Sequence, residues 1–89
     1  MKIKKEQEEQ IINFGALDYD SRIIASLLGL DEEEVEAYLN NKESEFSKLF
    51  QRGKDMADYV IDLKLFEMAK SGDIKALEKL ENRKWNRDN

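Results

Sequence analysis

Apolar residues recur three and four positions apart along most of this chain, the spacing that places side chains on one face of an α-helix. The longest such stretch, from Ser44 to Ser71, predicts one helix of about seven turns or two halves kinked at Gly53. Shorter stretches predict helices over about residues 4–14, 21–28 and 31–40, and a return helix begins at Ile74. With no proline and only 4 glycines, the chain is expected to be all-α.

Local signals mark where these helices begin and end. The first is expected to stop near Gly15, after a polar front half that would fray as an arm. Asp20 or Ser21 is expected to cap the second helix. Asp31 is expected to cap the third, with Glu34 three residues later completing a capping box. The pair Asn40 and Asn41 is expected to end it.

The second and third predicted helices have the spacing of a helix-turn-helix. Ala25 is small where the two helices would cross, Gly29 would supply a left-handed turn, and Val35 would close the core beneath. Ile24, Leu28 and Leu30 complete that small core. The unit is a candidate nucleic-acid reader.

A helical hairpin is expected after the long helix. Gly72 suits the left-handed C-cap of the long helix, and Asp73 suits the N-cap of the return helix. The return helix is expected to bury four side chains: Ile74, Ala76, Leu77 and Leu80. Trp85, near its end, is either a terminal staple of the hairpin or a contact for a partner.

In its second half, the long helix is apolar over more of its surface than one partner helix would cover. Four residues are therefore predicted to mediate self-association: Val60, Ile61, Leu65 and Phe66. Burial of these residues by the return helix and the helix-turn-helix is the alternative. At 89 residues the chain can bury only a modest core on its own.

The composition disfavours catalysis. There is no cysteine and no histidine, so thiolate and zinc sites and the commonest general base are absent. The carboxylate-rich region around residues 18–36 has no glycine-centred calcium loop. No catalytic residue, metal or cofactor is predicted, and without a long apolar run the protein is expected to be soluble and cytoplasmic, with no membrane partner.

The net charge of −5 is unevenly distributed. Acidic residues dominate positions 18–45, whereas basic residues dominate positions 75–87. Either the two segments complement each other, within or between molecules, or both are solvated surface. The predicted third helix opens with Asp31, Glu32, Glu33 and Glu34, which suits the positive end of a helix dipole and opposes contact with phosphates.

Two stretches carry a family resemblance: A-S-L-L-G-L-D-E-E-E-V in the helix-turn-helix, and I-D-L-K-L-F-E-M-A-K-S-G-D-I-K-A-L-E-K-L-E-N-R-K in the hairpin. Over about residues 14–84 the chain resembles the small terminase subunits of tailed bacteriophages and prophages. The resemblance implies a DNA-packaging adaptor without catalytic activity. In that family the helix-turn-helix engages DNA, the long helices assemble a ring, and a C-terminal segment contacts the large ATPase-nuclease subunit.

Carried over, residues 1–42 would be an arm and helix-turn-helix unit, and residues 43–89 the oligomerisation hairpin. Because the third helix begins with carboxylates, DNA contacts are expected instead around the start of the long helix. The residues predicted to make them are Lys42, Lys48, Arg52 and Lys54, with Lys2, Lys4 and Lys5 as an arm. The alternative function is a small regulatory protein that docks its acidic face on a basic protein partner.

Overall fold

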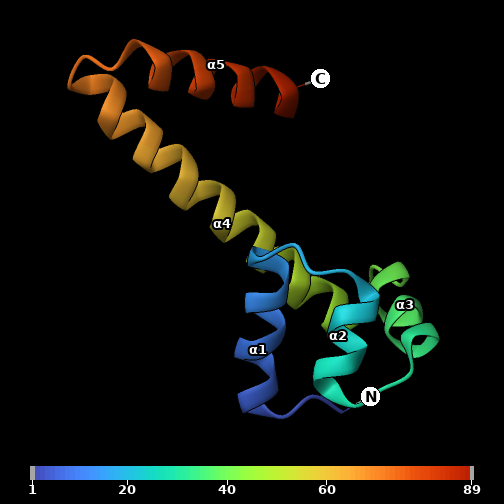
Figure 1. Ribbon diagram of the computed structural model, residues 1–89. Coiled ribbons are helices and arrows are strands. Elements are labelled where there is room, and N and C mark those ends of the chain that lie inside the picture. Colours follow the sequence, from blue (N-terminus) through green and yellow to red (C-terminus); the bar gives the residue numbers. More distant parts are fainter. Residues whose placement is uncertain (1, 89) are drawn as a thin grey trace. The chain divides into compact units, whose positions relative to one another are not determined.

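The computed structural model describes residues 2–88 and has five helices (Figure 1). They are α1 (Lys5–Ala16), α2 (Ser21–Leu28), α3 (Glu32–Asn40), α4 (Glu45–Lys70) and α5 (Ile74–Asp88). The all-α prediction is confirmed. Backbone contacts divide the chain into two compact units, Met1–Ala57 and Asp58–Asn89, so the division falls within α4. Among the described residues, no helix has both the length and the apolar character needed to span a bilayer.

The helix-turn-helix forms as its local signals predict. The Asp20 carboxylate accepts a hydrogen bond from the Ile23 backbone N–H at 2.9 Å and so caps α2. Gly29 ends α2 in the left-handed conformation, with φ 69° and ψ 33°. The Leu30 N–H then bonds to the Ala25 carbonyl at 3.0 Å. This turn leads directly into α3, which packs against α2.

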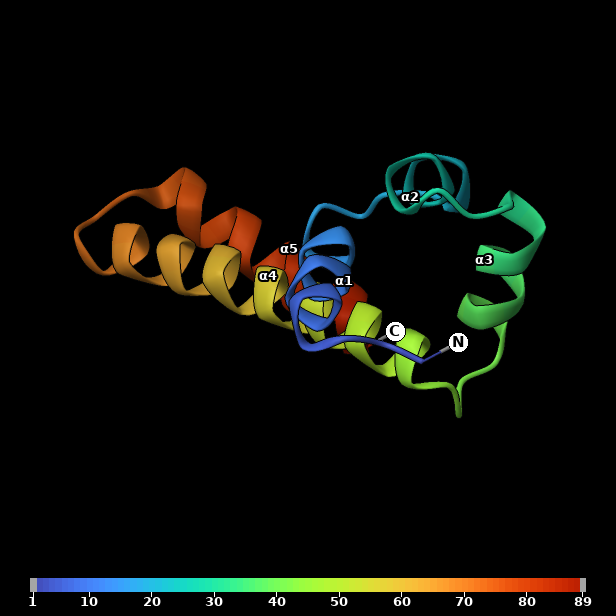
Figure 2. The ribbon, with the colours of Figure 1, turned by 90° about the horizontal axis from the view of Figure 1, so that it is seen from below.

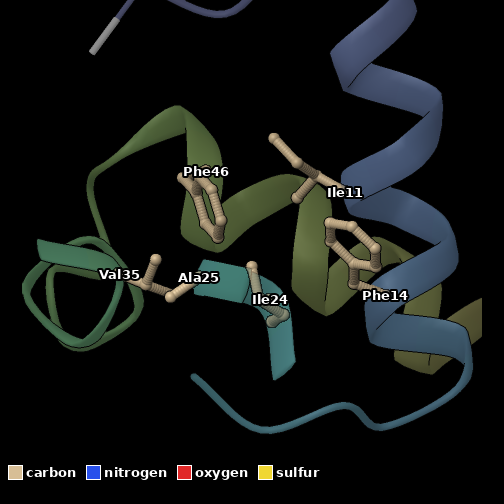
Figure 3. Close-up of a cluster of buried hydrophobic side chains, with 6 residues drawn as sticks. All are labelled: Ile11, Phe14, Ile24, Ala25, Val35 and Phe46. Atoms are coloured by element: carbon tan, nitrogen blue, oxygen red, sulfur yellow. The ribbon is translucent and has the colours of Figure 1, made fainter. Parts of the chain in front are cut away.

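One hydrophobic core holds the first unit together. Six buried side chains converge from four helices, as Figure 3 shows: Ile11, Phe14, Ile24, Ala25, Val35 and Phe46. Leu28 and Leu30 pack against this cluster while partly exposed. Ala25 and Val35 therefore lie where the helix-turn-helix pattern requires them, and α1 and the start of α4 close the core from outside the motif.

The predicted capping box of α3 is wrong. Asp31 occupies the N-cap position, but its side chain accepts no hydrogen bond there. Glu34 instead accepts a hydrogen bond at 2.9 Å from the hydroxyl of Tyr38, one turn further along the helix. The i,i+4 geometry on the helix surface lets this pair form. The other end is as expected, since α3 finishes at Asn40 with Asn41 as its C-cap.

Two glycines allow α1 and α4 to touch backbone to backbone. A Cβ atom on Gly15 would lie 1.9 Å from the Phe50 carbonyl oxygen, and one on Gly53 would lie 1.8 Å from the Ile12 carbonyl oxygen. The helix α1 ends at Ala16, close to the predicted stop near Gly15, and Gly15 itself lies buried in its last turn. Of the two alternatives for residues 44–71, the structure has the continuous helix, with Gly53 buried at the crossing.

In the second unit, α4 and α5 form the predicted hairpin, and the turn between them is visible in Figure 2. Gly72 has φ 104°. The Asp73 N–H bonds to the Met68 carbonyl at 3.1 Å, which is the hydrogen bond of a Schellman C-cap. The Asp73 carboxylate accepts the Ala76 N–H at 3.0 Å and so caps α5. Both predicted caps are confirmed.

Burial in the hairpin is much lower than the sequence suggests. Ala76 is buried and Leu80 is half-buried, whereas Ile74 and Leu77 are exposed, so their predicted burial is wrong. The reason is register. Ala76, Leu80 and Arg83 follow the four-three spacing that faces α4, and Ile74 and Leu77 fall outside that seam. Figure 1 shows the two helices close together at the turn and further apart toward the end of α5.

Candidate nucleic-acid interface

The four residues predicted to contact DNA line a single surface hollow in the first unit, with a volume of about 660 Å³. We call it the basic hollow. Its lining residues come from the end of α3, the following loop and the first half of α4: Leu39, Lys42, Ser47, Lys48, Phe50, Gln51, Arg52, Lys54 and Asp55. Residues of two consecutive helices and of the loop between them thus share one surface.

Hydrogen bonds between the end of α3 and the start of α4 hold the walls of the basic hollow. The Ser44 hydroxyl donates to the Tyr38 carbonyl at 2.7 Å, and the Ser47 hydroxyl donates to the Leu39 carbonyl at 3.3 Å. Ser44 also caps α4, because its hydroxyl oxygen accepts the Ser47 N–H at 3.0 Å. These contacts place the Lys42 loop beside the helical face that carries Lys48.

The charge of the basic hollow is mostly unneutralised. Lys54 forms an ion pair with Asp18 at 3.3 Å and lies 5.8 Å from the centre of the Phe50 ring. Within residues 2–88, the other three cations, Lys42, Lys48 and Arg52, have no ion pair. The only acidic residue in the lining, Asp55, accepts a hydrogen bond from the Gln51 amide at 3.1 Å. The surface is therefore suited to an anionic group.

Three of the four carboxylates of α3 are at the opposite end of that helix. Glu32, Glu33 and Glu34 form its exposed first turn, and Lys42 lies two residues beyond its last residue, Asn40. Nine residues at about 1.5 Å each separate the two ends by about 13 Å. Repulsion from these acids is therefore weakest where the cations gather. Within the described part of the chain, no three or more acidic side chains are arranged to hold a metal ion.

Sequence reasoning missed the neutral hydrogen-bonding residues of the basic hollow. Ser47 and Gln51 lie one helical turn apart on the same face as Lys48, Arg52 and Asp55. That periodicity could have identified them once the start of α4 was known. The predicted basic arm is not brought to the site, since Lys2, Lys4 and Lys5 do not line the hollow. Lys4 is instead the N-cap residue of α1, where its backbone N–H donates to the Gln7 side-chain oxygen at 3.0 Å.

The basic residues of the hairpin are partly neutralised within their own unit. Arg83 Nε lies 2.6 Å from Asp62 Oδ1, its Nη2 lies 3.2 Å from Asp58 Oδ1, and Arg87 also pairs with Asp62. The hydrogen bond from Arg83 is the main cause that lowers the pKa of the Asp62 carboxyl, with contributions from the Arg83 charge and from Arg87, while partial burial opposes them. Arg83 and Arg87 thus join α5 to α4.

The residues predicted to mediate self-association all lie in the second half of α4, but they differ in exposure. Val60, Ile61 and Phe66 are exposed, and Leu65 is half-buried. Trp85 is also largely exposed, so the hairpin does not enclose it.

No protein-family model matches this chain, and no curated protein or solved structure is significantly similar to it. Function is therefore inferred from the residues of the chain and from the sequence resemblance described above.

Proposed function

We propose that this protein is a non-catalytic DNA-packaging adaptor of the small terminase type, which holds duplex DNA by its phosphate backbone at the basic hollow. One observation carries the DNA-binding part: Lys42, Lys48, Arg52 and Lys54 line one surface. The packaging role, the bacterial cytoplasm as its location and the large ATPase-nuclease as its partner rest on the sequence resemblance.

The mode of binding follows from the composition of the basic hollow. Lysine and arginine side chains contact phosphate oxygens and fix a protein on the duplex without reading bases, and the second amide hydrogen of Gln51 can do the same. The Ser47 hydroxyl already donates to the Leu39 carbonyl. Three cations without ion pairs would release about three counterions, so the logarithm of the affinity should fall with the logarithm of salt concentration with a slope of about −3. Binding by a single chain should be weak and independent of sequence.

A charge-reversal pair tests this proposal. Lys48→Glu with Arg52→Glu should abolish retention of a fluorescent duplex at low salt, measured by anisotropy. The matched control is Lys75→Glu with Lys79→Glu, which makes the same charge change on exposed positions of α5 outside the hollow. The control should bind nearly as well as the wild type. Equal losses in both variants would mean that only the net charge matters, and the basic hollow would not be the site.

The packaging role has a separate test. A large P-loop ATPase-nuclease encoded beside this gene should co-purify with the protein when the two are expressed together. A gene neighbourhood without such an enzyme would contradict the packaging role. It would not bear on DNA binding at the basic hollow, which the anisotropy measurement tests separately.

A second candidate function is protein docking through the first turn of α3. Within residues 2–88, Glu32 and Glu33 are exposed and have no ion pair. Glu32→Gln with Glu33→Gln should leave DNA retention unchanged or increase it, because repulsion is removed. If this variant loses a specific DNA site that the Lys48 and Arg52 variant keeps, α3 reads bases. If no variant binds DNA even at low salt, docking becomes the leading function.

A further inference from the structure

Asp18 holds the left-handed position of the turn that ends α1, where glycine is the usual residue. Its φ is 56°, and among the described residues no other residue except glycine has a positive φ. The Tyr19 N–H bonds to the Phe14 carbonyl and the Asp18 N–H bonds to the Gly15 carbonyl, both at 3.0 Å, which is the pattern of a Schellman C-cap. Because these hydrogen bonds are made by the backbone, the turn itself does not require a carboxylate.

The close crossing of α1 and α4 brings this turn beside the basic hollow. A Cβ atom on Gly53 would lie 2.8 Å from the backbone nitrogen of Ala16, so the end of α1 lies against α4, as Figure 1 shows. Asp18 follows shortly after Ala16, and Lys54 directly follows Gly53. The two side chains meet with 3.3 Å between Asp18 Oδ1 and Lys54 Nζ. The contact between the two backbones therefore determines that this ion pair can form.

Lys54 is shared between Asp18 and the basic hollow. It lines the hollow together with Phe50, whose ring centre lies 5.8 Å from its Nζ, whereas Asp18 is not a lining residue. The side chains of Lys54 and Asp18 are 42% and 78% exposed. The ammonium group is therefore accessible to an anion that enters the hollow, and the ion pair with Asp18 is open to exchange.

The Asp18 carboxylate and a phosphate group are alternative acceptors for the same ammonium group. While Asp18 neutralises Lys54, this lysine adds no net charge to the hollow and has no condensed counterion of DNA to release. Exposed ion pairs contribute little to the stability of a fold and are screened by salt. The main effect of this pair is therefore on the charge that the hollow offers to a ligand.

We propose that Asp18 is an internal competitor of DNA, which weakens binding at the basic hollow by holding Lys54. Four cations line the hollow, and Asp18 leaves three of them, Lys42, Lys48 and Arg52, available to phosphates. Loss of the Asp18 charge makes Lys54 the fourth contact. This inference rests on the proposed DNA binding and identifies the residue that sets its strength.

Asp18→Asn tests the proposal, because asparagine tolerates the left-handed conformation and carries no charge. In duplex anisotropy titrations, the slope of the logarithm of affinity against the logarithm of salt concentration should steepen from about −3 to about −4, with roughly tenfold tighter binding near about 50 mM salt. Glu9→Gln removes the same charge from an exposed position of α1 that does not line the hollow. This control should keep the wild-type slope, and an equal gain in both variants would overturn the proposal.

A double variant shows whether the gain passes through Lys54. Asp18→Asn with Lys54→Gln should return to the wild-type affinity and slope, and a gain that persists would overturn the proposal. If Lys48→Glu with Arg52→Glu abolishes DNA retention but Asp18→Asn binds as the wild type does, the proposed function stands and only the role of Asp18 is wrong. If neither the wild type nor Asp18→Asn binds at low salt, both are wrong.

Discussion

At the residue scale, Gly29 shows how one backbone conformation sets the helix-turn-helix. Its φ is 69°, and a Cβ placed on it would have no heavy atom within 4 Å. Any cost of a side chain there comes from the backbone alone. Gly29→Ala should lower the free energy of unfolding by about 1 kcal/mol, Gly29→Asn by less, and Gly29→Val by more, because asparagine tolerates this conformation and a β-branched residue does not.

Urea unfolding of the three Gly29 variants checks this order. A loss for Gly29→Asn as large as that for Gly29→Val would show that crowding, and not backbone conformation, decides the position.

Asp62 gives the hairpin a pH dependence. Arg83 and Arg87 lower its pKa in the folded protein below the ordinary 3.8. A carboxyl with a depressed folded pKa contributes stability that is complete above its unfolded pKa and is lost as pH falls through the folded pKa. Wild type should therefore exceed Asp62→Asn in melting temperature at pH 7, and the difference should shrink below about pH 4.

Thermal melts of the two proteins between pH 7 and pH 2, followed by circular dichroism, measure that difference. Other carboxylates titrate in both proteins and largely cancel. A difference that stays constant across this range would contradict the role assigned to the Asp62 charge.

At the scale of elements, the crossing of α1 and α4 depends on two residues without side chains. Replacing an exposed glycine in a helix by alanine is normally stabilising by about 1 kcal/mol. At Gly15 and Gly53 the sign should reverse, because each Cβ would meet a carbonyl oxygen of the facing helix at less than 2 Å. Each variant should lose roughly 1–3 kcal/mol of unfolding free energy.

The double variant sharpens this test. Once one Cβ has forced the two helices apart, the second should cost less, so the Gly15→Ala and Gly53→Ala losses should sum to more than the loss in the double variant. Ser26→Ala, on an exposed position of α2, controls for helix propensity and should be neutral or slightly stabilising. Stabilisation by either glycine variant would contradict the close contact.

At the scale of the whole molecule, the two units differ in how they keep apolar residues from water. The first unit has a core drawn from four helices. Among the described residues, the second has one buried residue and leaves most of its large hydrophobic side chains exposed. The predicted self-association and the proposed DNA binding are therefore tested by different substitutions. Phe66→Glu should lower the mass measured by light scattering, whereas Lys48→Glu with Arg52→Glu should lower DNA retention and leave that mass unaltered.

The chain's own sequence determined the features that depend on nearby residues. Helix caps act through hydrogen bonds that reach three to five residues along the backbone, so their positions could be predicted without knowledge of the tertiary structure. The caps predicted in this way involve Asp20, Gly29, Gly72 and Asp73. The all-α class follows from the same local periodicity. Even here another local hydrogen bond can form in place of the predicted one, as in α3, where Glu34 accepts from Tyr38 and does not complete the capping box.

Only the tertiary structure decided which distant residues meet. The sequence predicts a helix end near Gly15 and a kink at Gly53 as one of two alternatives, because no nearby residue indicates that another helix faces these glycines. The outward direction of Ile74 and Leu77 depends on the register of α5 against α4. The basic cluster could be proposed from charge, but Lys42 joins Lys48 and Arg52 because serine hydroxyls tie the start of α4 to the end of α3. Periodicity determines which residues share a helix face, and tertiary packing determines which other element that face contacts.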